Sequence, residues 1–128
     1  MTLARKTDAR HRRGQLAESI AQGVLLKNGL RLITQNYRCN LGEIDLIFWD
    51  DDCLVFVEVR ARANAHFAFP ADTVDYHKQK KIIRTAEFFL LQYAQYSNNP
   101  CRFDVVGIDF SASPPSVEWI KDAFVTHY

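Results

Sequence analysis

The sequence predicts a mixed α/β domain in which helices flank a mixed central sheet. Stretches with helical periodicity and stretches rich in β-branched residues follow one another in the order α-β-β-β-α-β-β. The 128 residues suffice for one core but not for two ordinary domains. The hydrophobic share of 48% and the charged share of 24% are typical of globular proteins. We therefore expect a single domain over residues 14–128.

The helices are located by the spacing of their apolar side chains. Residues 15–27 carry an apolar stripe at helical spacing, and Gly29 follows as a C-terminal stop. A second helix is expected to begin near Val74, where Asp72 and Asp75 resemble a capping pair. The apolar stripe of this second helix consists of Ile82, Ile83, Ala86, Phe89, Leu90 and Tyr93.

The strands are located by runs of Ile, Val, Phe and Leu that lie between turn residues. The expected strands cover residues 30–38, 43–49, 54–60, 101–110 and 117–124. The segment SASPPS at 111–116 is typical of a loop and does not mark a domain boundary. No internal repeat or low-complexity segment interrupts this order, which supports one compact unit.

Residues 1–13 form a basic amino-terminal arm. Such an arm contacts phosphates in many nucleic-acid-binding proteins, but it is also common as a solubilising tail that need not be ordered. No apolar region follows the arm, and no stretch approaches the roughly 18 apolar residues of a membrane span. We therefore expect a cytoplasmic protein with no membrane partner. The charged residues of the arm are Arg5, Lys6, Asp8, Arg10, Arg12 and Arg13.

Cysteine and histidine spacing argues against two common classes of site. Cys39, Cys53 and Cys101 lie far apart and form no CxxC pair, which disfavours both a disulfide framework and a zinc knuckle. The histidines are scattered, without the spacing that places two imidazoles on one helix face. The sequence therefore predicts reduced thiols and no zinc centre.

Acidic side chains interrupt two strands that are otherwise apolar. Glu43 and Asp45 share a strand face with Ile47, while Ile44, Leu46 and Phe48 point the other way. In the next strand, Glu58 and Arg60 share one face. A turn centred on residues 51–52 places Asp45 opposite Glu58 and Glu43 opposite Arg60, whereas a loop of odd length would shift this register.

Two carboxylates directly opposite each other destabilise a sheet by up to about 1 kcal/mol before desolvation is counted. A divalent cation such as Mg²⁺ would relieve the repulsion, because it binds oxygen ligands and is often held by one or two carboxylates. The alternative is a solvent-facing salt-bridge network with Arg60 or Arg62. Glu18, at the border of the first apolar stripe, either reaches toward the sheet or is an ordinary boundary glutamate.

Four segments together resemble the YraN-like bacterial proteins: QLAES with Glu18, GEIDLI, VFVEVRAR and HKQKKIIRTAEFFL. These proteins belong to the restriction-endonuclease-like PD-(D/E)xK nuclease superfamily and are similar in layout to archaeal Holliday junction resolvases. The resemblance covers Arg13 to Asp109. It implies a nuclease-like domain with an αβββαβ core, in which Glu18, Asp45, Glu58 and the carbonyl of Val59 hold Mg²⁺ or Mn²⁺ and phosphodiester bonds of DNA are hydrolysed.

The sequence departs from the family pattern at Arg60, where the resemblance implies a catalytic lysine. Arginine can clamp a phosphate oxygen, but a guanidinium does not deprotonate and so cannot assist proton transfer. The resemblance also places Lys78 and Lys81 of the second helix near the site, where they would contact the nucleic-acid backbone. A solvated helix face is the alternative for these lysines. The further candidates for phosphate contact are Arg12, Arg13 and Arg62.

Three functions follow from these residues. The first is a metal-dependent endonuclease that acts on DNA with structural selectivity, with Glu18, Asp45, Glu58 and Arg60 as catalytic residues. The second is a non-catalytic nucleic-acid-binding protein on the same fold, in which Arg60 contacts phosphate. The third is a protein interaction module whose acids form salt bridges. A sheet edge and the apolar segment 119–128 offer surfaces for a homodimer, which the resolvase resemblance favours.

Overall fold

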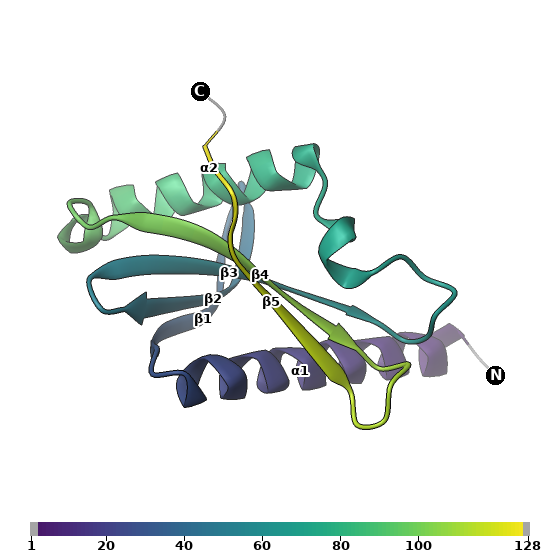
Figure 1. Cartoon of the computed structure of the whole chain (residues 1–128). Coiled ribbons are helices and arrows are strands. Elements are labelled where there is room, and N and C mark those ends of the chain that lie inside the picture. The colour runs from purple at the N-terminus through teal and green to yellow at the C-terminus, as the bar shows by residue number, and fades with distance from the viewer. Residues whose placement is uncertain (1–2, 127–128) are drawn as a thin grey trace.

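The computed structural model describes residues 3–126, so residues 1–2 of the basic arm and 127–128 of the C-terminal segment lie outside the described residues. The chain is a mixed α/β protein with one five-stranded sheet in the order β1-β2-β3-β4-β5 (Figure 1). Strands β3 and β4 are parallel, and the other neighbours are antiparallel. The elements are α1 (Leu3–Lys27), β1 (Arg31–Cys39), β2 (Gly42–Asp50), β3 (Cys53–Arg62), the 3-10 turn η1 (Pro70–Thr73), α2 (Tyr76–Gln92), the 3-10 turn η2 (Ala94–Tyr96), β4 (Cys101–Asp109) and β5 (Ser116–Phe124).

The two long helices cover opposite faces of the sheet (Figure 1). Each face therefore has its own apolar core, and the central strand β3 contributes to both, as expected for a strand buried on two sides. The core under α1 includes Ala17, Ala21, Leu25, Leu46, Phe48, Val55 and Val57. The core under α2 includes Ile47, Leu54, Phe56, Ile82, Ile83, Ala86 and Phe89.

Helix α2 begins where its capping residue predicts. Asp75 is the N-cap, and its side-chain Oδ1 accepts a hydrogen bond of 2.9 Å from the backbone N–H of Lys78. Val74 precedes this cap and packs in the core, so the helix starts slightly later than expected. Asp72 belongs to η1 and does not form a capping pair with Asp75, because the chain turns once as a 3-10 helix before α2 begins.

Helix α1 begins at Leu3 and not near residue 15, so the described part of the basic arm is helical. Apolar periodicity located the start too late because the buried stripe begins only at Ala17, while the preceding turns expose basic side chains such as Arg10 and Arg12. Arginine, lysine and alanine are good helix formers, so the basic segment can continue the helix before the apolar stripe begins. No helix within residues 3–126 is long and apolar enough to cross a membrane.

A two-residue turn joins β2 to β3 and sets their register. Asp50 pairs with Cys53, and Asp51 adopts a φ of 53°, which aspartate tolerates better than most residues. Of the two loop lengths left open by the sequence, the structure has the even one. Strands β1 and β5 form the two edges of the sheet as described, and a homodimer through either edge stays a prediction.

Candidate functional site

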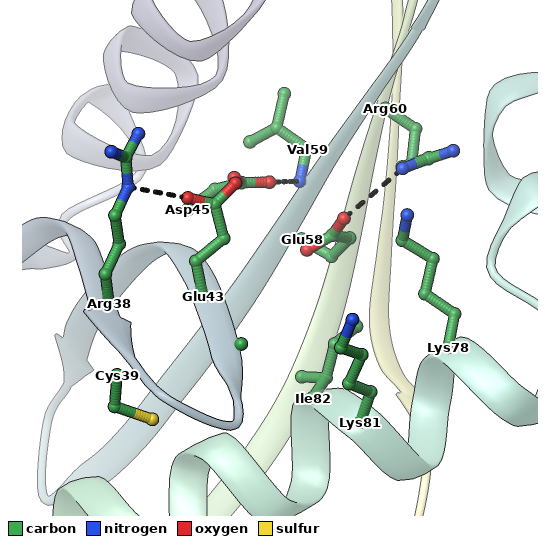
Figure 2. Close-up of a pocket in the computed structure, with 11 residues that line it drawn as sticks. Arg38, Cys39, Glu43, Asp45, Glu58, Val59, Arg60, Lys78, Lys81 and Ile82 are labelled. Atoms are coloured by element: carbon green, nitrogen blue, oxygen red, sulfur yellow. Dashed lines mark hydrogen bonds and ion pairs between the residues drawn. The ribbon is translucent and has the colours of Figure 1, made fainter.

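The candidate site lies where β2 and β3 diverge. Strand β2 remains paired with β1 as far as Gly42, but its pairing with β3 ends at Leu46 and Val57. Beyond that pair, the carboxylate Oδ2 of Asp45 accepts a hydrogen bond of 2.8 Å from the backbone N–H of Val59. A cavity of about 480 Å³ opens here between the diverging strands and α2 (Figure 2).

This divergence explains two predictions that were wrong. Glu43 does not lie opposite Arg60 in a paired register, because no β2–β3 pairing extends that far; it accepts a hydrogen bond of 2.8 Å from Arg38 Nε instead. Ile44 does not share a face with Leu46, because the period-two alternation is interrupted where β2 leaves β3. Ile44 packs in the core under α2.

Asp45 and Glu58 form a close acidic pair in the cavity. Burial raises the pKa of Glu58 to about 8, and the charge of Asp45 adds to this effect. Burial also raises the pKa of Asp45, against the opposing effect of the Val59 N–H. The two carboxyl groups lie within hydrogen-bonding reach of each other, and only 8% of Glu58 is exposed. The structure therefore brings together the two strand carboxylates that the sequence placed opposite each other.

Cationic side chains face this acidic pair. Lys78 and Lys81 extend from α2 into the cavity, and Lys78 lowers the pKa of Glu58 more than Arg60 does (Figure 2). Arg60 Nε donates to Thr73 Oγ1 at 2.7 Å, and its Nη1 lies 3.5 Å from Glu58 Oε1. The Arg60 guanidinium is therefore held beside the pair by η1. Sequence reasoning missed Thr73, because its role depends on a contact between separate elements.

Glu18 lies in a neighbouring hollow and not in the cavity itself. Arg38 and Glu43 line both spaces, so their exposed ion pair stands between Glu18 and the acidic pair. Burial raises the pKa of Glu18, and the charge of Asp45 is the next contribution. Glu18 is thus electrostatically coupled to Asp45. Among residues 3–126, no three side chains of the His, Cys, Asp and Glu types form a ready metal-binding group.

The oxygen atoms at the cavity suit a hard divalent cation. Asp45 and Glu58 supply paired carboxylates whose mutual repulsion a cation would relieve. The N–H of Val59 points toward β2, and the carbonyl of a strand residue lies on the same side as its N–H. The Val59 carbonyl therefore faces the side of β3 on which the β2 ladder has ended. Two carboxylates, one carbonyl and water match the usual coordination of Mg²⁺.

The three other arginines predicted to contact phosphate lie in different surroundings. Arg62 is used structurally: its Nη2 pairs with Asp109 Oδ2 at 2.7 Å, which lowers the pKa of Asp109, and its guanidinium lies 4.4 Å from the ring centroid of Phe69. Arg13 lines a further groove beside β3. Arg12 is exposed on α1 and lines none of the cavities at the site.

The fold and site define a mixed α/β protein in which a pair of acidic side chains, Asp45 and the buried Glu58, shares a cavity with Arg60, Lys78 and Lys81. The chain matches the model of "Uncharacterised protein family UPF0102" over residues 17–108, and it belongs to this YraN-like family, as the sequence predicted. That range includes all four predicted catalytic residues, Glu18, Asp45, Glu58 and Arg60.

Three relatives show how far the similarity extends. A UPF0102 protein of Psychromonas ingrahamii is 46% identical over 125 residues, covering 97% of this chain and 98% of the relative. A UPF0102 protein of Pseudomonas paraeruginosa is 42% identical over 114 residues, covering 88% and 91% of the two chains. One of Legionella pneumophila is 42% identical over 112 residues, covering 88% and 93%. Each similarity thus spans most of both chains.

Proposed function

We propose that this protein is a divalent-metal-dependent endonuclease that hydrolyses phosphodiester bonds of DNA. The observation that carries the proposal is the carboxylate pair of Asp45 and the buried Glu58, which lines one open cavity together with Arg60, Lys78 and Lys81. Acids alone would attract a cation, and cations alone would attract phosphate. Their juxtaposition suits a substrate that is itself anionic and that is cleaved with the help of a metal ion.

The fold supports the proposal at the level of element order. The resemblance implies an αβββαβ core, and α1, β1, β2, β3, α2 and β4 follow one another in that order. The implied metal ligands Asp45 and Glu58 come from neighbouring strands and meet where those strands separate. We therefore assign the chain a restriction-endonuclease-like core as part of this proposal.

Asp45, Glu58 and the Val59 carbonyl would hold Mg²⁺ or Mn²⁺, with Glu18 adding negative charge from the neighbouring hollow. When bound, such a metal supplies activation of water and neutralisation of charge on the scissile phosphate. The chain's own contribution is to fix these oxygens before substrate arrives. The Val59 N–H does this for Asp45, because it holds one carboxylate oxygen and leaves the other available.

The cations would bind and orient the phosphodiester. Arg60 is fixed by Thr73, so its guanidinium presents a permanent charge at a defined place beside Glu58. Lys78 and Lys81 extend from α2 into the same cavity, toward Glu58 (Figure 2). A phosphate bound in this cavity would receive positive charge from these three side chains, which stabilises the additional negative charge of the transition state.

The test is a cleavage assay with Mg²⁺ and with Mn²⁺ on labelled single-stranded, duplex, flapped and four-way-junction DNA. Asp45→Asn should abolish metal-dependent cleavage because it removes one of the paired carboxylates. Asp51→Asn is the matched control: it makes the same chemical change in the exposed β2–β3 turn, where asparagine also tolerates a positive φ. Cleavage that persists in a folded Asp45→Asn protein would refute the proposed active site.

A second function, DNA binding without cleavage, is supported by Arg60 itself. The position at which the resemblance implies lysine holds a guanidinium that cannot release a proton. In this alternative, the folded wild-type protein shifts DNA in a binding assay but does not cut it with either metal. Arg60→Lys is then the decisive variant, because a gain of metal-dependent cleavage would show that the rest of the site is competent.

A further inference from the structure

A second groove of about 530 Å³ continues from the candidate site along β3. It lies between the basic part of α1 and the loop that follows β3. Val59 and Arg60 line both the cavity and this groove, so the two spaces adjoin at these residues. We call the second space the arginine groove, because its lining includes Arg10, Arg13 and Arg62 as well as Arg60.

The charged residues that line the arginine groove are all arginines. No aspartate or glutamate is among the residues that line it. Arg62 has a carboxylate partner in Asp109, but Arg10 and Arg13 form no ion pair with a carboxylate within residues 3–126. These two arginines lie on one side of α1, three residues apart, which places them along one line beside β3. Their spacing suits successive phosphates of a nucleic-acid strand.

The loop wall of the groove displays an exposed aromatic ring. Phe67 lines the groove, yet 60% of its surface is exposed. Its backbone is held, because its carbonyl oxygen accepts a hydrogen bond of 3.1 Å from Arg62 Nη1. Asn64 Oδ1 also accepts a hydrogen bond of 2.9 Å from the N–H of His66, which orders the loop before Phe67. The ring is thus presented to solvent by a fixed backbone.

We propose that the arginine groove binds the phosphates of an unpaired DNA strand and that Phe67 stacks on one of its bases. This inference rests on the proposed function and narrows it to substrates with a single-stranded segment beside the cut site. Cationic grooves with exposed aromatic rings bind single strands, because every unpaired base offers a π-face. In a duplex, those faces are covered by neighbouring bases. Arg60, which lines both spaces, connects the bound strand to the acidic pair.

The first test compares DNA affinities by fluorescence anisotropy in EDTA, so that cleavage does not interfere. Phe67→Ala should weaken binding of single-stranded and flapped DNA by about fivefold to a hundredfold, the range expected from one lost base stack. Binding of blunt duplex should change by less than about twofold, because no base face is available. Phe67→Tyr should retain affinity. Leu91→Ala is the control, since it removes an exposed apolar side chain from α2 instead.

The second test separates phosphate contact from stacking. Arg13→Ala should lower the slope of log affinity against log salt concentration by about 0.7 on single-stranded DNA, the value for one lost phosphate contact. Arg31→Ala, an exposed arginine at the start of β1, should leave the slope unchanged. A 2-aminopurine in the bound strand should be quenched by wild type and by Phe67→Tyr, but not by Phe67→Ala.

The outcomes distinguish this inference from the proposed function. If Phe67→Ala binds single-stranded DNA as tightly as wild type does, the stacking role is refuted. Metal-dependent cleavage of duplex DNA that is lost in Asp45→Asn would then still support the nuclease. Equal affinity of wild type for blunt duplex and single strand would likewise overturn the substrate preference alone. Absence of both binding and cleavage would overturn the proposed function together with this inference.

Discussion

Replacement of Glu58 by glutamine should stabilise the metal-free protein at alkaline pH. Glu58 is almost fully buried beside Asp45, and the pKa of Glu58 is raised from 4.5 to about 8, first by burial and then by the charge of Asp45. Ionised Glu58 therefore repels its neighbour in a poorly hydrated place. Glutamine has nearly the same shape and carries no charge, so the repulsion disappears at every pH.

The sign and size of the effect follow from proton binding. Between pH 4.5 and about 8, the folded protein keeps a proton on Glu58 that the unfolded chain has released. The free energy of unfolding therefore falls as pH rises through this window. A pKa difference from 4.5 to about 8 corresponds to about 5 kcal/mol, at about 1.4 kcal/mol per pKa unit. Because solvent reaches the pair through the open cavity, we expect wild type to lose about 2–5 kcal/mol.

The assay is urea unfolding of wild type and Glu58→Gln in EDTA, at about pH 4.5 and about pH 9. The two proteins should be similarly stable at the lower pH, and the variant more stable at the higher. Mg²⁺ added at the higher pH should raise the free energy of unfolding of wild type, by more at higher Mg²⁺ concentration, because it binds the folded protein. It should not stabilise the variant. Glu118→Gln, an exposed change on β5, is the control. A variant with the same pH dependence as wild type would refute the reasoning.

Three further substitutions test the scaffold by urea unfolding. Gly107→Ala places a Cβ 2.9 Å from Pro70 Cβ, so it should displace η1, weaken cleavage and lower the free energy of unfolding by about 1–3 kcal/mol. An unchanged free energy of unfolding would contradict this contact. Asp104→Ala should lower the free energy of unfolding by about 3–5 kcal/mol, because the buried Asp104 accepts hydrogen bonds from Arg102, Trp119 and the N–H of Asp122. A loss below about 1 kcal/mol would show that Asp50, the other partner of Arg102 at 2.8 Å, compensates for the change. Phe56→Ala should also lower the free energy of unfolding by about 3–5 kcal/mol, because its ring is buried between β3 and α2. A much smaller loss would mean that neighbouring side chains fill the space left by the ring.

Local sequence patterns were sufficient to predict the central part of the site. A two-residue turn fixes a register that extends to Leu46 and Val57, and Asp45 and Glu58 come directly after that pair, close enough to interact. The capping residue Asp75 likewise located the start of α2, which carries Lys78 and Lys81 to the cavity. These features could be predicted because each depends on residues close together in the chain.

The other parts of the site depend on where strands separate, which no short pattern encodes. Glu43 was expected opposite Arg60, but β2 leaves β3 at Leu46 and the register ends there. The contact between Arg60 and Thr73 depends on how η1 packs across β4, where Gly107 leaves room for Pro70. Tertiary packing decided these positions, and the local signals at each residue were compatible with several outcomes.

The contacts of the acidic residues separate the competing functions. A salt-bridge network would pair each carboxylate closely with a guanidinium, as Asp109 is paired with Arg62 at 2.7 Å. Asp45 forms no such ion pair with the side chains of residues 8–126; it interacts with the Val59 N–H and with the carboxyl of Glu58. The only ion pair of Glu58 in that range is 3.5 Å long. The cations near Asp45 and Glu58 thus pair with them less closely than Arg62 pairs with Asp109, which supports the proposed divalent metal ion over an interaction module that salt bridges would stabilise.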